Sequence, residues 1–136
     1  MIVVDTNVIH YCWVQGQNTG LAQAVRRRDP DWHAPLLWRS EMRNILTAYL
    51  RRGLLSRPQI DSILRAVDHA LAQKSHSVSD TSVLDVVEAS AITAYDAEFV
   101  ALAGTLAVPL VTADRAVLKA YPDRALTMEA YIAEKR

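Results

Sequence analysis

Four acidic residues occupy positions from which they could form one site. Asp5 follows an apolar, β-branched run, and Asp114 follows a second apolar run after a single turn. Asp96 lies at the start of a predicted helix, and Glu41 lies in the first turn of another. In an open parallel sheet, ligands bind beyond the carboxyl ends of the strands. The four carboxylates are therefore candidates for a shared site at one sheet edge.

Each acid taken alone also has a structural explanation. An aspartate at a helix start is usually an N-cap, and a glutamate in the first turn usually interacts with the helix dipole. Asp5 fits this explanation less well, because the end of a buried strand is unfavourable for an unpaired charge. If all four carboxylates converge, protonation or bound cations must relieve their mutual repulsion.

A convergence of this kind predicts metal-assisted hydrolysis. An all-oxygen ligand set favours Mg²⁺, with Mn²⁺ as a possible substitute, over zinc. Two such ions about 4 Å apart can activate a water and stabilise the leaving oxygen of a phosphodiester. His33, His69 and His76 lack paired metal-ligand spacing, which also argues against zinc.

Short apolar runs alternate with amphipathic stretches along the whole chain. We predict strands at 2–4, 32–36, 75–78, 108–111 and 124–126, and helices at 6–16, 21–28, 42–50, 56–71, 82–92, 95–107, 114–121 and from 127 onward. Strands that alternate with helices favour an α/β fold. The predicted architecture is a single-domain α/β/α sandwich over residues 1–136, with a mainly parallel sheet of about five strands.

Composition limits the cellular context and the mode of binding. Cys12 is the only cysteine among 136 residues, so no intramolecular disulfide is possible and a reducing compartment fits best. No apolar run approaches the ~20 residues that span a bilayer, and no secretory signal is present, so we expect a cytoplasmic protein without membrane contact. Fifteen basic and fifteen acidic residues give zero net charge, so any binding of RNA must come from local arrangement.

The acids lie within four segments that resemble the signature blocks of PIN domains. The segments are Val4-Asp5-Thr6-Asn7, Ser40-Glu41-Met42-Arg43-Asn44, Tyr95-Asp96-Ala97 and Leu110-Val111-Thr112-Ala113-Asp114. Their order, their spacing and a length near 136 are most similar to the VapC-type toxins of type II toxin–antitoxin modules. The resemblance implies an α/β/α sandwich, Mg²⁺-dependent endonucleolytic cleavage of RNA, homodimerisation and inhibition by a cognate antitoxin.

The resemblance also assigns roles to the acids. By matching position, Asp5 and Asp96 would bind the metal directly, and Glu41 and Asp114 would complete the catalytic cluster, partly through water. Many PIN domains carry a further acidic or amide residue just after the fourth acid, whereas Arg115-Ala116 follows here. The occupancy of a second metal position is therefore left open.

Polar neighbours of the acids are candidates for orienting water or substrate. Asn7 and Thr112 would orient carboxylates or waters. Thr6 and Asn7 could equally be helix-capping residues. Arg39 and Arg43 flank Glu41 and are candidates for contact with the RNA backbone.

Other functions use the same residues. One alternative is a metal-dependent phosphatase with Asp5 as nucleophile. Such an enzyme usually has a second acid two residues later, and Asn7 at that position argues against it. A PIN nuclease of RNA processing that is not a toxin and a non-catalytic PIN-like interaction module are further alternatives. The chain has no P-loop, no G-x-S-x-G elbow and no G-x-G-x-x-G fingerprint, which argues against NTPases, α/β-hydrolases and Rossmann dehydrogenases.

Overall fold

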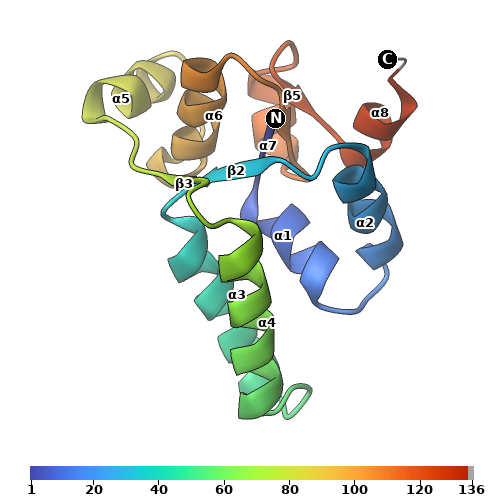
Figure 1. The fold of residues 1–136 in the computed structure, drawn as a ribbon. Helices are drawn as coiled ribbons and strands as arrows, with labels where there is room; N and C mark the ends of the chain where they lie inside the picture. Colours follow the sequence, from blue (N-terminus) through green and yellow to red (C-terminus); the bar gives the residue numbers. More distant parts are fainter. Residues whose placement is uncertain (135–136) are drawn as a thin grey trace.

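Five short parallel strands run through the centre of the molecule (Figure 1). The computed structural model describes residues 1–134, so the last two residues of the predicted domain lie outside the described part. The strands are β1 (Ile2–Val4), β2 (Trp32–Pro35), β3 (Ser75–His76), β4 (Leu110–Val111) and β5 (Ala125–Leu126). They are hydrogen-bonded in the order β3-β2-β1-β4-β5, and each neighbouring pair is parallel.

Helices cover both faces of this sheet. Within the described residues they are α1 (Thr6–Trp13), α2 (Thr19–Arg28), α3 (Trp38–Arg51), α4 (Arg57–Ala70), α5 (Asp80–Glu88), α6 (Ala94–Leu106), α7 (Arg115–Ala120) and α8 (Met128–Ala133). α6 packs against β1, β2 and β4, and Figure 1 shows α5 beside it on the upper side. α1, α3 and α4 lie on the lower side. The predicted α/β fold with a parallel sheet is confirmed.

Several predicted boundaries were wrong by a few residues. α1 ends at Trp13 rather than near residue 16, and α3 begins at Trp38 rather than at residue 42. α2 begins at Thr19 rather than at residue 21. α5 covers Asp80–Glu88 rather than 82–92, because the Ser79 side chain caps its first turn. β4 begins at Leu110 rather than at residue 108, because the backbone N–H of Val108 still bonds to the helix carbonyl of Ala103.

The topology creates a crevice between β1 and β4. β1 is buried on both sides, and Ile2, Val3 and Val4 are at most 2% exposed. The sheet continues from β1 to β2 on one side and to β4 on the other. In doubly wound sheets, the point where the strand order reverses is where ligands bind, beyond the carboxyl ends of the strands. Asp5 follows β1 and Thr112 follows β4, so both lie at this crevice.

α3 and α4 form a hairpin that projects from the sheet (Figure 1). Met42 and Leu46 at its base are buried, at 0% and 1% exposed, whereas Leu50 and Leu54 near its tip are 44% and 62% exposed. Gly53, with φ 69°, permits the turn that ends α3. Within the described residues, every helix is too short or too polar to cross a membrane.

Candidate active site

The first carboxylate of the site is held between the ends of β1 and β4. Asp5 is the N-cap of α1, and its Oδ1 accepts a hydrogen bond of 3.0 Å from the backbone N–H of Val8. Its Oδ2 accepts hydrogen bonds from the hydroxyl of Thr112 and, at 3.3 Å, from the backbone N–H of Ala113. The Thr112 hydroxyl oxygen accepts a hydrogen bond of 3.0 Å from the backbone N–H of Asp114. These contacts connect Asp5 to the segment that carries the fourth acid.

Glu41 reaches the same place from α3. It lies in the first turn of that helix, next to the fully buried Met42. Its Oε1 accepts a hydrogen bond of 2.7 Å from the hydroxyl of Thr6, which is only 5% exposed. Because Thr6 directly follows Asp5, this hydrogen bond brings two acids together that are far apart in the sequence.

The other two acids lie at the starts of α6 and α7. The backbone N–H of Asp96 donates a hydrogen bond of 3.1 Å to the hydroxyl of Thr93, which caps α6. Asp114 caps α7 and accepts a hydrogen bond of 3.0 Å from the backbone N–H of Val117. All four acids therefore lie at the N-cap or in the first turn of a helix, where the positive end of the helix dipole favours a negative charge. Asp5 and Asp114 are therefore both N-caps and members of the cluster, whereas the alternative that Asp96 is an N-cap is wrong, because Thr93 caps α6.

The four acids line one small cavity. Its volume is about 50 Å³. Its lining consists of Asp5, Thr6, Asn7, Glu41, Asp96, Phe99, Leu110, Thr112, Asp114 and Val117. The polar groups are carboxylates, hydroxyls and one amide, and the apolar residues are Phe99, Leu110 and Val117. A cavity of this size suits an ion with its water better than a nucleotide.

Burial and mutual repulsion raise the pKa of Asp5, Glu41 and Asp96. Burial raises the pKa of Asp5, and the nearby charge of Asp114 adds to this, while the hydrogen bond from Thr112 opposes it. Burial also raises the pKa of Glu41, and the charges of Asp96 and Asp5 act in the same direction. The pKa of Asp96 is raised by burial and by the charge of Asp114. The repulsion thus connects all four carboxylates.

The donor set fits a hard divalent cation. A cation would offset the repulsion that raises these pKa values, and the oxygen ligands are those that Mg²⁺ and Mn²⁺ prefer. Among residues 1–134, no three acidic, histidine or cysteine side chains are already arranged as ligands of one ion. The carboxylates of Asp5 and Glu41 are hydrogen-bonded to Thr112 and Thr6 instead. A cation would compete with these hydroxyls for the carboxylate oxygens.

The predicted polar neighbours Thr6, Asn7 and Thr112 are all at the cavity. Thr6 and Thr112 donate to carboxylates, and Asn7 lines the cavity from the first turn of α1. The N-cap of α1 is Asp5. The alternative that Thr6 or Asn7 caps this helix is therefore wrong.

Two predicted arginines do not line the acidic cavity. Arg39 forms an ion pair of 2.7 Å with Asp68, because α4 packs beside α3 and brings this carboxylate within reach. Arg43 is exposed on α3, two residues beyond Glu41. Its position leaves it open to solvent.

Sequence analysis missed one further acid, Glu98. Its charge contributes to the raised pKa of Glu41, and burial raises the pKa of Glu98 itself. Glu98 lies three positions after Tyr95 in α6, so the two side chains share one face of the helix. No pattern in the sequence indicates that Glu98 approaches Glu41, because the packing of α6 sets this relationship.

Comparison with known proteins agrees with the fold. The chain belongs to the PIN domain family, which matches residues 2–123. The family predicted from the four sequence blocks is therefore confirmed. The chain is also similar to ribonuclease VapC3 of Pyrobaculum aerophilum, with 27% identity over 124 residues. That alignment covers 89% of this chain and 95% of the relative.

Proposed function

We propose that this protein is a Mg²⁺-dependent endoribonuclease and the toxin of a toxin–antitoxin pair. The observation that carries the proposal is the convergence of Asp5, Glu41, Asp96 and Asp114 on one small cavity at the crevice between β1 and β4. Membership of the PIN family and similarity to a ribonuclease named VapC3 support it. A scaffold without catalysis has no need of four mutually repelling carboxylates in one place.

The chain's own residues would hold the cation and the substrate in position. Asp5 and Asp96 would bind Mg²⁺, or Mn²⁺ in its place, and Glu41 and Asp114 would complete the cluster. A cation bound there would lower the pKa of a bound water, so that the water could lose a proton and attack a phosphodiester as hydroxide. Thr112 would orient the Asp5 carboxylate through its hydroxyl.

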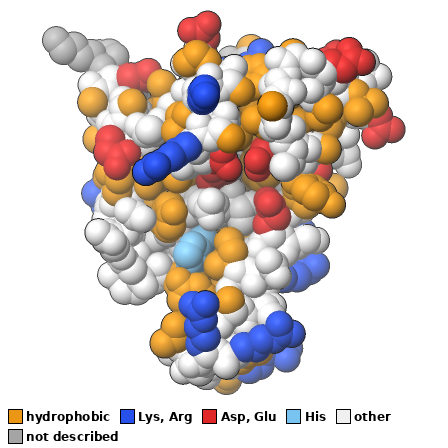
Figure 2. All heavy atoms as spheres, turned by 180° about the vertical axis from the view of Figure 1, so that it is seen from behind, with side chains coloured by type: hydrophobic (Ala, Val, Ile, Leu, Met, Phe, Trp, Pro, Cys, Tyr) orange, Lys and Arg blue, Asp and Glu red, His pale blue; other side chains and the backbone are white. Residues whose placement is uncertain are grey.

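RNA binding would depend on basic groups around the acidic centre. Figure 2 shows acidic side chains gathered near the middle of one face, with basic side chains to the left and at the lower end. The lower end is the tip of the α3–α4 hairpin, which carries the exposed residues Arg51, Arg52 and Arg57. Such a local arrangement can bind a phosphate backbone although the net charge of the chain is zero. Arg43 lies on the same hairpin.

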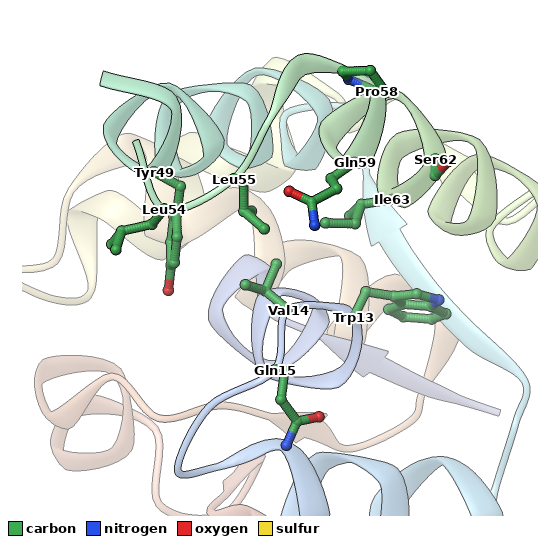
Figure 3. Close-up of a pocket in the computed structure, with 10 residues that line it drawn as sticks. All are labelled: Trp13, Val14, Gln15, Tyr49, Leu54, Leu55, Pro58, Gln59, Ser62 and Ile63. Atoms are coloured by element: carbon green, nitrogen blue, oxygen red, sulfur yellow. The ribbon is translucent and has the colours of Figure 1, made fainter. Parts of the chain in front are cut away.

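The antitoxin would bind an apolar groove between α1 and the α3–α4 hairpin. This groove has a volume of about 770 Å³. Figure 3 shows Trp13 and Val14 on one wall and Leu55 and Ile63 on the other, with Val14 pointing toward Leu55. An exposed apolar groove commonly marks an interface, and an extended or helical segment with apolar side chains would fit it.

Aromatic residues connect this groove to the acids. Tyr49 lines the groove, and its hydroxyl lies 3.0 Å from Nε2 of His10. The ring centroid of Tyr11 lies 5.4 Å from that of His10, and burial and the charge of Asp5 raise the pKa of Tyr11. A bound antitoxin segment could therefore extend from the groove to the acidic cavity. A basic side chain at its end would replace the charge of the cation and inhibit cleavage.

RNA cleavage by the purified protein tests the proposal. We expect wild-type protein to cleave single-stranded RNA with Mg²⁺ or Mn²⁺, to lose activity in excess EDTA, and to gain none from zinc alone. Asp5→Asn and Asp96→Asn should each abolish cleavage in a folded protein. Asp123→Asn is the matched control, since Asp123 is exposed and outside the acidic cavity. Wild-type cleavage by folded Asp5→Asn protein, or full activity in EDTA, would contradict the assignment.

A further inference from the structure

A second cavity lies beside the acidic cavity, between α5 and the first turns of α6. Its volume is about 340 Å³. It is lined by Val78, Asp80, Val83, Leu84, Ala94, Tyr95 and Glu98. We call it the α5–α6 cavity. It is distinct in composition from the acidic cavity, because four aliphatic side chains and one aromatic ring are among its seven lining residues.

Two residues connect the α5–α6 cavity to the acids. Glu98 lines the cavity and is followed in α6 by Phe99, which lines the acidic cavity. Tyr95 immediately precedes Asp96 in α6. A molecule bound in the α5–α6 cavity would therefore lie next to the carboxylates that face the cleaved phosphodiester.

The ring of Tyr95 is available for stacking. Tyr95 is 65% exposed, although it is a large aromatic residue, and Leu84 on the other side of the cavity is 55% exposed. Flat aromatic rings beside a nucleic-acid site bind unpaired bases by stacking, and this interaction tolerates different bases. Neither side chain contributes to the buried core, so packing of the core does not explain the exposure.

The charges in this cavity select a base rather than a phosphate. Its acidic side chains are the carboxylates of Asp80 and Glu98, which repel a phosphate group, and within residues 1–134 no basic side chain lines it. Carboxylate oxygens instead accept hydrogen bonds from N–H groups on a base edge. Guanine presents two adjacent N–H groups on its Watson–Crick edge, which match the two oxygens of one carboxylate. Uracil presents a single N–H between two carbonyls, which would face the carboxylate unfavourably.

We infer that the α5–α6 cavity binds an unpaired base of the RNA next to the cleaved phosphodiester, with Tyr95 stacking on the base and Glu98 accepting its N–H groups. The order of preference is guanine first and uracil last. This inference rests on the proposed ribonuclease activity and adds a base preference to it. It makes Tyr95 and Glu98 substrate-binding residues rather than members of the metal-binding cluster.

The inference is tested with short single-stranded RNAs that differ at one position next to the cleaved bond. Tyr95→Leu keeps an apolar side chain but removes the ring, and we expect it to raise KM about tenfold with little change in kcat. Tyr95→Phe keeps the ring and should behave like wild type. Glu98→Gln should reduce the preference for guanine over uracil. The useful measurement is the ratio of the cleavage rates of the guanine-containing and the uracil-containing RNA. An altered charge on Glu41 would change both rates by the same factor and leave this ratio unchanged.

Binding without cleavage provides a second measurement. The same RNAs are added to the folded Asp5→Asn protein, with and without Tyr95→Leu, and fluorescence anisotropy is recorded. We expect the affinity to fall about tenfold when the ring is removed. Glu129→Gln, an exposed change on α8, should alter neither affinity nor base preference.

Three outcomes would overturn the inference. If wild-type protein cleaves RNA but Tyr95→Leu leaves KM and affinity unchanged, the base site is wrong and the ribonuclease stands. If Tyr95→Leu converts an oligomer to a monomer in light scattering, a second copy of the chain covers the cavity instead. If wild-type protein neither binds nor cleaves any of the RNAs, the proposed function and the base site both fail.

Discussion

The hydroxyl of Thr6 donates a hydrogen bond of 2.7 Å to Oε1 of Glu41, and the two residues are 35 positions apart. This contact joins the first turn of α1 to the first turn of α3 beside the carboxylate of Asp5. It lowers the pKa of Glu41, whereas burial, the largest effect on this group, raises it. Thr6 therefore acts as a positioning residue that helps Glu41 carry its charge in a partly buried site.

Removing this hydroxyl should change the pH dependence of cleavage. Thr6→Val has nearly the same shape as threonine but cannot donate, so the pKa of Glu41 should rise further. Glu41 would then stay neutral to a higher pH, and the acidic limb of the rate profile should move to higher pH. Thr6→Ser keeps the hydroxyl and should restore the wild-type profile. A Thr6→Val protein with an unchanged acidic limb would show that this hydrogen bond does not affect the reaction.

Removing divalent cations should expose the repulsion among the acids. The folded-state pKa values of Asp5, Glu41 and Asp96 are raised. Their contribution to stability is therefore fully present below their unfolded pKa values and is lost as pH rises through the folded values. In EDTA, the melting temperature of the wild type should fall as the pH rises through these folded-state pKa values. At pH 8, Asp5→Asn should melt at the same temperature as wild type or at a higher one.

Adding Mg²⁺ should reverse this loss. A cation that binds only the folded state stabilises it by about 2.7 kcal/mol at a concentration 100-fold above its Kd. The thermal shift should grow with pH, because more of the carboxylates are then charged, and it should be much smaller for Asp5→Asn. Equal shifts for both proteins at every pH would place the cation elsewhere in the molecule.

Ala107 offers a test of backbone strain at the end of α6. It adopts a left-handed conformation with φ 54° and ψ 46°, which glycine adopts without steric cost. Ala107→Gly should therefore raise the free energy of unfolding by about 1 kcal/mol. Ala66→Gly, the same change at an exposed position inside α4, should lower it by about 1 kcal/mol. Chemical denaturation of both variants measures the difference, and a shared sign would contradict the prediction.

The toxin proposal predicts both assembly and an effect on growth. Exposed apolar surface on the hairpin, including Leu50 and Leu54, favours association with a second copy or with an antitoxin. Light scattering should give about twice the 15.1 kDa mass of one chain. Expression alone should arrest growth of a host cell, and Asp5→Asn should not. A monomer that cells tolerate at high level, with its nuclease activity intact, would remove the toxin assignment and leave the PIN fold unaffected.

Local patterns in the sequence determined the elements and the four acids. β1 is an uninterrupted apolar run, so its burial and its end at Asp5 follow from composition alone. Ser56 and Gln59 form a capping box at the start of α4, a signal contained within four residues. These features depend on near neighbours in the chain, and the family resemblance of the four blocks depends on nothing more than residue types and their order.

The tertiary structure alone decided which contacts the residues around the acids make. Arg39 and Glu41 are two positions apart, yet Arg39 pairs with Asp68 whereas Glu41 accepts the hydroxyl of Thr6. The charge of Glu98 contributes to the raised pKa of Glu41 only because α6 packs against β1, close to the start of α3. Helix packing sets such contacts between distant segments, and the periodicity of a single helix reports which face is apolar but not which neighbour covers it.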